Sequence, residues 1–545
     1  MKVKYVFTFL CLISVCAISI AQNSNEILCK VLDVESKYPV SYATIQFKGE
    51  QKGVIADEDG GFRLPIEYVT SNVFVTISSI GFETLTVDIR TLDVSVLNTI
   101  YLKPKTEALN EVLIIAQTKK NTKNSKALTH ITPESIIKEA IKKIPVNYPK
   151  APHSYMAYYR DYQLVNNNYY NLNEFILETF DAGFQTSKFW FKNNVTAMYS
   201  YNRNKNYYQD SLLQKSVYGD SKIINKDNSA IFINTLSNEL EILNVHNPIR
   251  NYNKLSFSFV DKFKDDFINN HVFKFEKIKY INDTPLYEIS FLSENSDDKK
   301  FKAKGEIYIA KDDYSIYKIT YKILENEQFE QNKSLGNNGT NFQSEERLRT
   351  LYEINVEYKQ VNNKMYLNYM TFNNRFIIKE PNPFRVVELE FNVKDEVFYI
   401  TFNKPVDESS LSKKSRFKLK YKTKKLTVKK IELVDDKIVK VEVVDWTLGE
   451  NVNKKKIKSE DFSCELKNIK DVSGVKLNKD TKLKGFQFRE FFTQEIFENK
   501  EPVPNLIYVN KNLPLSATYT NPPNFDINTY WVNSPLKKTK DPIKI

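Results

Sequence analysis

Glycine, histidine and cysteine are scarce in this chain of 545 residues, which has 13 glycines, 4 histidines and 4 cysteines. Neither a phosphate-cradling glycine loop nor a Gly-x-Ser-x-Gly elbow is present. None of the histidines has the His-Glu-x-x-His spacing of a zinc peptidase; they are His130, His153, His246 and His271. The sequence therefore predicts no catalytic residue, no cofactor and no metal, and it disfavours carboxypeptidase activity in particular.

Carboxylates are plentiful, but no arrangement of them stands out. Adjacent acids occur at 265–266, 297–298 and 312–313, and neighbours on a strand point to opposite faces. A glycosidase needs two carboxyl groups that converge from separate strands. A glycan-active hydrolase with carboxylates in the middle of the chain is therefore kept as an alternative to a non-catalytic function.

Long apolar runs are missing except near the N-terminus. Residues 1–4 are basic, residues 5–15 are apolar, and Ser19-Ile20-Ala21 supplies small residues at the positions that signal peptidase reads. This pattern predicts a signal peptide over 1–21, cleaved after Ala21 and too short to span a bilayer. A lipoprotein signal at Cys16 is the alternative, which the preceding valine disfavours. No later run predicts a transmembrane helix, so the mature chain is expected in the periplasm or on an outer-membrane-associated surface.

Two cysteines remain after the signal, Cys29 and Cys464, and we expect them in different domains. Two distant cysteines give no disulfide framework. The net charge is +12, but an exported chain is not expected to bind nucleic acid.

Residues 22–105 predict a small β-sandwich. Asp57-Glu58-Asp59-Gly60-Gly61 is a turn signal, because Asp and Gly tolerate the positive φ of a tight reversal. Phe62 and Leu64 then alternate with Arg63, as on a strand with one buried face.

These features occur in the order of a known family. The strand at 39–43, the turn at 57–62 and the strand end Ser79-Ile80-Gly81-Phe82 closely resemble the carboxypeptidase-regulatory-like module, a prealbumin-like β-sandwich common in exported Bacteroidetes proteins. In true carboxypeptidases this module accompanies a separate zinc enzyme, so the resemblance implies a fold and no activity.

A polar, basic stretch over 106–130 predicts a linker. A helix follows it: Thr132 is a candidate N-cap, Pro133 fits the first helical position, and Pro145 is expected to end the helix. Apolar residues at helical spacing from Ile136 to Ile144 predict a buried stripe.

The middle region, 131–383, predicts an antiparallel, curved sheet with one or more short helices. Hairpins are expected at 302–321 and 353–369. This succession resembles the half-barrel of periplasmic lipoprotein carriers, which implies a further alternative, a carrier of lipid or lipoprotein. Clustered aromatic residues indicate either strand cores or a sugar-stacking surface: Tyr155, Tyr158, Tyr159, Tyr162, Tyr169 and Tyr170.

Residues 384–485 resemble bacterial Ig-like domains through the strand end Phe402-Asn-Lys-Pro405-Val406-Asp407 and the turn Ile469-Lys-Asp471-Val-Ser-Gly474. This β-sandwich is a candidate insertion, in which case the tail over 486–545 packs partly on the middle domain. The basic end of the tail, with Lys537, Lys538, Lys540 and Lys544, is predicted to be disordered.

The Ig-like region contains a run of basic residues with no acid between them. Such a patch could bind an anionic polysaccharide or lipopolysaccharide by charge, or it could be a solvated sheet edge that discourages aggregation. The patch comprises Lys413, Lys414, Arg416, Lys418, Lys420, Lys422, Lys424 and Lys425.

The sequence thus favours a mainly β, non-catalytic binding or scaffold protein of the cell envelope. Its expected partner is a protein or a glycan, and a role beside TonB-dependent uptake or in surface glycan handling would fit this composition of modules.

Overall fold

The computed structural model describes residues 26–66, 74–108, 131–188, 191–214, 222–223, 238–252, 265–293, 301–326, 348–378, 383–392, 395–444, 458–479 and 483–540. The signal peptide and its two candidate cleavage sites, residues 109–130 of the predicted linker, and the last five residues lie outside these ranges. Within them the chain is mainly β, as the sequence predicts.

The N-terminal module is a sandwich of two small sheets, ordered β4-β1-β7 and β3-β2-β5-β6. Its strands alternate inward apolar and outward polar residues, and Phe62 and Leu64 point into the core as expected. The turn before them has Gly60 at φ +76°, a conformation that suits glycine. The strands are β1 Glu26–Asp33, β2 Thr44–Phe47, β3 Gly53–Ile55, β4 Gly61–Pro65, β5 Phe74–Ser78, β6 Leu85–Asp88 and β7 Asn98–Leu102.

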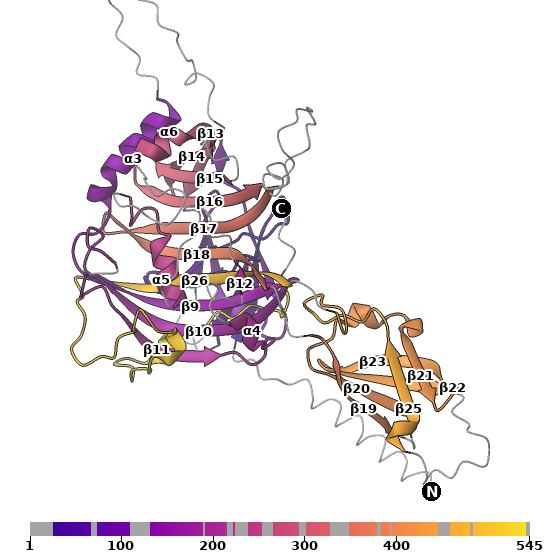
Figure 1. Cartoon of the computed structure of the whole chain (residues 1–545). Coiled ribbons are helices and arrows are strands. Elements are labelled where there is room, and N and C mark those ends of the chain that lie inside the picture. Colours follow the sequence, from indigo (N-terminus) through magenta and orange to yellow (C-terminus); the bar gives the residue numbers. More distant parts are fainter. Residues whose placement is uncertain are drawn as a thin grey trace, which may run out of the picture.

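A twelve-stranded antiparallel sheet forms the centre of the protein (Figure 1). Its order is β11-β10-β9-β26-β18-β17-β16-β15-β14-β13-β8, with β12 paired to β18. Both predicted hairpins are confirmed, as β15–β16 and β17–β18. The strands are β8 Thr106–Glu107, β9 His153–Val165, β10 Asn168–Asp181, β11 Thr196–Arg203, β12 Lys222–Ile223, β13 His271–Ile281, β14 Thr284–Ser293, β15 Phe301–Ala310, β16 Ile316–Asn326, β17 Leu348–Val361, β18 Lys364–Ile378 and β26 Leu483–Glu498.

Strand β26 lies between β9 and β18. The chain therefore leaves the large sheet after β18, forms a separate lobe, and returns as the next strand of the same sheet (Figure 1). We call this lobe, residues 383–479, the two-sheet insert. Its strands are β19 Val386–Asn392, β20 Val397–Phe402, β21 Phe417–Tyr421, β22 Lys424–Lys425, β23 Thr427–Asp435, β24 Ile438–Val444 and β25 Phe462–Leu466.

The sheets of the insert have the orders β19-β20-β24-β23 and β22-β21-β25. They pack together through aromatic rings, since the ring of Phe391 lies 4.4 Å from that of Phe398 in its own sheet and 4.5 Å from that of Phe462 in the other. Cys464 is free and half-buried here, and Cys29 is free and buried in the module.

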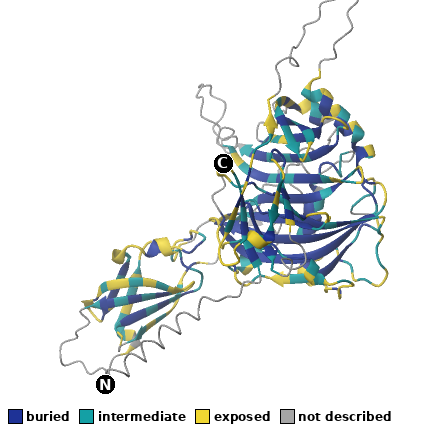
Figure 2. Ribbon diagram, turned by 180° about the vertical axis from the view of Figure 1, so that it is seen from behind, coloured by how far each residue is buried: buried dark blue, intermediate teal, exposed yellow. Residues whose placement is uncertain are grey.

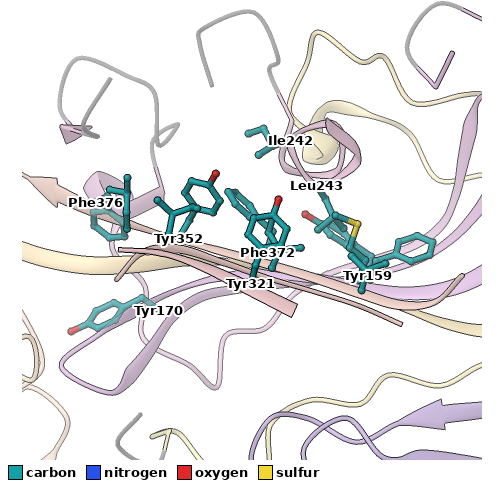
Figure 3. Close-up of a cluster of buried hydrophobic side chains, with 14 of the residues drawn as sticks. Tyr159, Tyr170, Ile242, Leu243, Tyr321, Tyr352, Phe372 and Phe376 are labelled. Atoms are coloured by element: carbon teal, nitrogen blue, oxygen red, sulfur yellow. The ribbon is translucent and has the colours of Figure 1, made fainter. Parts of the chain in front are cut away.

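One face of the large sheet, which we call the helix face, is covered by helices (Figure 1). Helix α3 (Pro133–Asn147) packs on β13 and β15, α5 (Glu239–Val245) on β18 and β26, and α6 (Asp265–Asn270) on β13; the single-turn α4 (Ser211–Gln214) lies against β10. Figure 3 shows Tyr159, Tyr321, Tyr352 and Phe372 rising from the strands toward Ile242 and Leu243 of α5.

Helix α3 begins as the sequence predicts but ends later. The Thr132 hydroxyl caps it by accepting a hydrogen bond from the Ser135 backbone N–H, and the Ser135 hydroxyl in turn accepts one from the Thr132 backbone N–H. Pro145 was expected to end the helix, yet it lies inside the last turn and Tyr148 is the C-cap. Pro145 costs the helix little stability, because its missing N–H removes only one backbone hydrogen bond near the helix end. The apolar stripe of α3 still packs on the sheet.

The opposite face, which we call the module face, packs against the N-terminal module and the C-terminal tail. Tyr42 of the module stacks on Tyr369 of β18 with ring centroids 5.0 Å apart. Asn533 of the tail joins three elements: it accepts from the Arg63 N–H at 3.0 Å, donates to the Ile55 carbonyl at 3.0 Å, and its own carbonyl accepts from Arg160 at 2.8 Å. Strands β9 and β10 are consequently buried along their whole length (Figure 2).

The basic end of the tail is ordered as far as Lys540, which differs from the predicted disorder. Lys540 is 4% exposed, ion-paired with Glu58, and its N–H donates to the Asn167 carbonyl at 2.8 Å. The acidic turn of the module attracts this lysine, an interaction that a local reading of a lysine-rich terminus cannot detect.

Candidate functional site

The described residues form hollows close to the large sheet. One of them, which we call the inner cavity, has a volume of about 70 Å³ and lies on the helix face, between α3, α5 and the ends of β9 and β10. Another, the module cleft, has a volume of about 410 Å³ and separates β2 and β5 of the module from the turns of β13–β14 and β17–β18.

The inner cavity contains a buried ion pair. Arg250 donates from Nη1 to both carboxylate oxygens of Asp181, at 2.8 and 2.6 Å, and from Nη2 to the Thr186 carbonyl at 2.8 Å. Burial alone would raise the pKa of Asp181, but Arg250, Lys188 and His153 outweigh it and hold that pKa below its ordinary value. Asp181 is thus a fixed carboxylate that anchors Arg250, which leaves it unsuited to proton transfer.

His153 in the same cavity already has two partners. Its Nδ1 lies 3.0 Å from the Ala151 carbonyl and its Nε2 lies 2.9 Å from the Tyr155 hydroxyl. The carbonyl can only accept, so Nδ1 carries the proton and Nε2 accepts from the tyrosine. Burial lowers the pKa of His153, so the ring is neutral and structural. An engineered cavity of about 150 Å³ holds one benzene, so this smaller, charged one cannot enclose an acyl chain.

The module cleft is lined mainly by amides and hydroxyls. On the module side, Thr44 and Gln46 are the outward residues of β2, alternating with the buried Ile45 and Phe47. Across the cleft, Asn282 and Asn362 form the tips of two hairpins and have φ of +52° and +47°. Asparagine tolerates this conformation, so the residues that make the turns possible also place amide groups at the cleft.

Asn368 is the most deeply buried polar residue in the lining of the cleft. It is the bulged residue of β18, because Tyr369 pairs with Glu357 and Leu367 with Tyr358, and a bulge redirects a side chain. Its Nδ2 donates to the Thr44 hydroxyl and to the Glu357 carboxylate, each at 3.0 Å. These two acceptors assign the amide orientation.

The carbonyl oxygen of Asn368 has no partner among the described residues, although the residue is only 2% exposed. A buried acceptor without a hydrogen bond costs roughly 1–3 kcal/mol. A donor from water or from a ligand in the cleft would remove that cost.

The cleft has one carboxylate and one ammonium in its lining. Glu357 is 7% exposed and paired with Lys318 at 3.5 Å. Lys359, two residues further along β17, makes no hydrogen bond or ion pair with the part of the chain that the structure describes. Burial lowers the pKa of Lys359 to about 8, against an opposing effect of Glu495.

The structure places the basic residues that the sequence grouped into a patch on and beside β21 and β22, where Lys420 pairs directly with Lys425. Lys413 and Lys414 precede β21 and are exposed; Lys420, Lys424 and Lys425 lie exposed on β21 and β22. Arg416 donates to the Ser410 carbonyl, Lys418 lies 3.4 Å from Glu465, and Lys422 lies 4.0 Å from Asp461. Acids from β25 and the turn before it therefore reach the patch, which the sequence run did not reveal.

The clustered tyrosines of β9 and β10 are buried. Tyr155, Tyr158, Tyr159, Tyr162, Tyr169 and Tyr170 are at most 6% exposed, so they fill the sheet core and do not form a surface for sugars.

The histidines that the structure describes lie apart, at the inner cavity, beside α5 and at the start of β13; His130 lies outside the described residues. Within the described ranges, no group of three or more His, Cys, Asp and Glu side chains could hold a metal ion.

Sequence reasoning missed the cleft residues, including Asn368 and Lys359. The only available signal was the hairpin around Asn362 and Asn363, which places two strand ends together. Nothing in the sequence indicates that the module covers those ends.

Comparison with known proteins supports the N-terminal assignment. The family model described as the CarboxypepD_reg-like domain matches residues 29–114. That region is the first sandwich of the structure together with the start of the segment that leads from it. No curated protein and no solved structure matches the chain. Within the described residues, no helix is long and apolar enough to cross a membrane.

Proposed function

We propose that this protein is an exported, non-catalytic binding protein of the cell envelope that takes a polyhydroxylated ligand, such as an oligosaccharide, in the module cleft. The observation that carries the proposal is the Asn368 carbonyl oxygen, a buried acceptor without a partner in a cleft lined by amides and hydroxyls. Sugar hydroxyls are donors and acceptors at once and complement such a lining.

The size and position of the cleft support the same function. Small-molecule sites typically occupy roughly 300–1,000 Å³ and lie preferentially at domain interfaces. The module cleft, at about 410 Å³ between the module and the large sheet, fits both criteria. In this proposal the N-terminal module has a role of its own, because it forms one wall of the ligand site and needs no attached enzyme.

The carboxylates favour binding over hydrolysis. The lining of the inner cavity includes Asp181 and that of the module cleft includes Glu357, each held by a cation. Hydrolysis of a glycosidic bond needs two carboxyl groups in one cleft, one of them able to donate a proton.

In our proposal the two-sheet insert is an Ig-like spacer, and the protein delivers glycans to an uptake system such as a TonB-dependent transporter.

Binding is tested with the mature protein and a panel of neutral and acidic oligosaccharides by titration calorimetry, with product analysis of the same samples. The variant Gln360→Trp fills the cleft from an exposed lining position, and Thr427→Trp, exposed on β23 of the insert, is the matched control. We expect saturable binding without product, abolished by Gln360→Trp and unchanged in the control. Turnover of a glycan, or binding unaffected by Gln360→Trp, would contradict the proposal.

A further inference from the structure

We infer that the ligand of the module cleft carries a negative charge, and that Lys359 binds it. The ligand class is an acidic saccharide, with a carboxylate as in a uronic acid. This inference rests on the function proposed above and specifies its substrate.

The charge balance of the cleft leads to this conclusion. Glu357 is neutralised by Lys318 at 3.5 Å and accepts from Asn368 at 3.0 Å, so its charge is satisfied within the protein. Lys359 has no such partner among the described residues. The lining therefore presents one positive charge that no hydrogen bond or ion pair of the described residues satisfies, and only the more distant carboxylate of Glu495 acts on it.

Burial of the Lys359 amine, without a hydrogen bond or ion pair from the described residues, disfavours its charged form. Strand β17 fixes its direction: Val356 and Tyr358 are buried in the sheet core, whereas Glu357 and Lys359 belong to the alternate positions that line the cleft. Burial lowers the pKa of the amine to about 8, which leaves most of the population charged at pH 7. A desolvated cation without a partner is a position at which an anion gains a charge-assisted hydrogen bond.

The remaining groups favour a sugar over a simple anion. Asn368 offers an acceptor, and Gln46, Gln360 and Asn362 provide further amides around the same space. A cleft of about 410 Å³ is far larger than a carboxylate or phosphate requires. A saccharide with one acidic group would occupy both the amide-lined part and the position opposite Lys359.

The experiment compares a uronic-acid disaccharide with the neutral disaccharide obtained from it by reduction of the carboxyl groups. We expect the wild-type protein to bind the acidic sugar more tightly. Lys359→Gln should weaken acidic binding about 10- to 100-fold, the range for one hydrogen bond to a charged group, and leave neutral binding unchanged. Lys359→Arg should retain the preference, and Lys48→Gln, at an exposed lysine outside the cleft, should behave as wild type.

The outcomes separate this inference from the proposed function. If neither sugar binds, the proposed function itself fails. If both bind equally to the wild type, or if Lys359→Gln weakens both equally, the cleft binds sugars and the inference about charge is wrong. Should Lys359→Gln fail to fold, the salt dependence of wild-type binding decides, since screening weakens the acidic sugar alone if a charge is recognised.

Discussion

The large sheet is covered by helices on one face and by the module and tail on the other, and the two contacts differ in chemistry. On the helix face, apolar and aromatic side chains make most of the contact, with Phe372 packed among Tyr352 and His246, and the ion pairs Arg250–Asp181 and Arg489–Glu239 lie among them. On the module face, charged groups are buried: Arg160 and Glu490 form an ion pair with both side chains at most 1% exposed. The same strands supply both faces through alternate residues.

This difference bears on the site. Apolar packing is non-directional, whereas a buried ion pair with its hydrogen bonds requires one arrangement. Arg160 donates to Asn533, which also holds the module through Arg63 and Ile55. The polar contacts therefore fix the module on the sheet, and with it the width of the module cleft.

The largest expected effect comes from breaking the ion pair of the module face. Arg160→Met leaves Glu490 buried without its cation, and such a loss costs about 3–5 kcal/mol. The double variant Arg160→Met/Glu490→Leu removes both charges and should regain much of the stability, since apolar replacement of a buried pair is often neutral. Urea unfolding of the two variants and the wild type measures this, and a double variant no more stable than the single one would show that the pair is not the source of the cost.

A smaller effect, with a pH dependence, is expected on the helix face. His246 is fully buried, stacks on Phe372 with centroids 4.1 Å apart, and neither ring nitrogen has a partner among the described residues. Burial, aided by Arg489, lowers its pKa from 6.5 to about 3. The unfolded chain therefore binds a proton that the folded protein cannot, and stability is lost as the pH falls from about 6.5 toward 3.

His246→Phe removes this titration and the two unsatisfied nitrogens. It should stabilise the protein by about 1 kcal/mol at pH 7, and the gain should grow by about 1.4 kcal/mol for each pH unit below 6.5. Thermal melting from pH 7 to pH 4 measures the trend, with His153→Phe as the comparison because both nitrogens of His153 are bonded. A gain that does not vary with pH would mean that His246 binds a proton equally well in the folded and the unfolded protein.

Local structure could be predicted from the sequence, and long-range pairing could not. The turn at Gly60, the start of α3 at Pro133 and the two hairpins follow from residues a few positions apart. The place of β26 at the centre of the sheet depends on contacts such as Arg160 with Glu490, 330 positions apart, which no local periodicity encodes. The site was missed for the same reason, because Thr44 meets Asn368 across 324 positions.

The smallest effect is expected at the cap of α3, and it separates local from tertiary stabilisation on the helix face. Thr132→Ala removes the side-chain acceptor for the Ser135 N–H, and a lost N-cap typically costs about 1 kcal/mol. Thr132→Ser should behave as wild type because it keeps the hydroxyl. If the apolar stripe of α3 holds the helix on the sheet, urea unfolding should show only this modest loss. A loss as large as that from breaking the Arg160 ion pair would show instead that the cap decides whether α3 docks at all, and the helix face would then depend on a directional polar contact as much as the module face does.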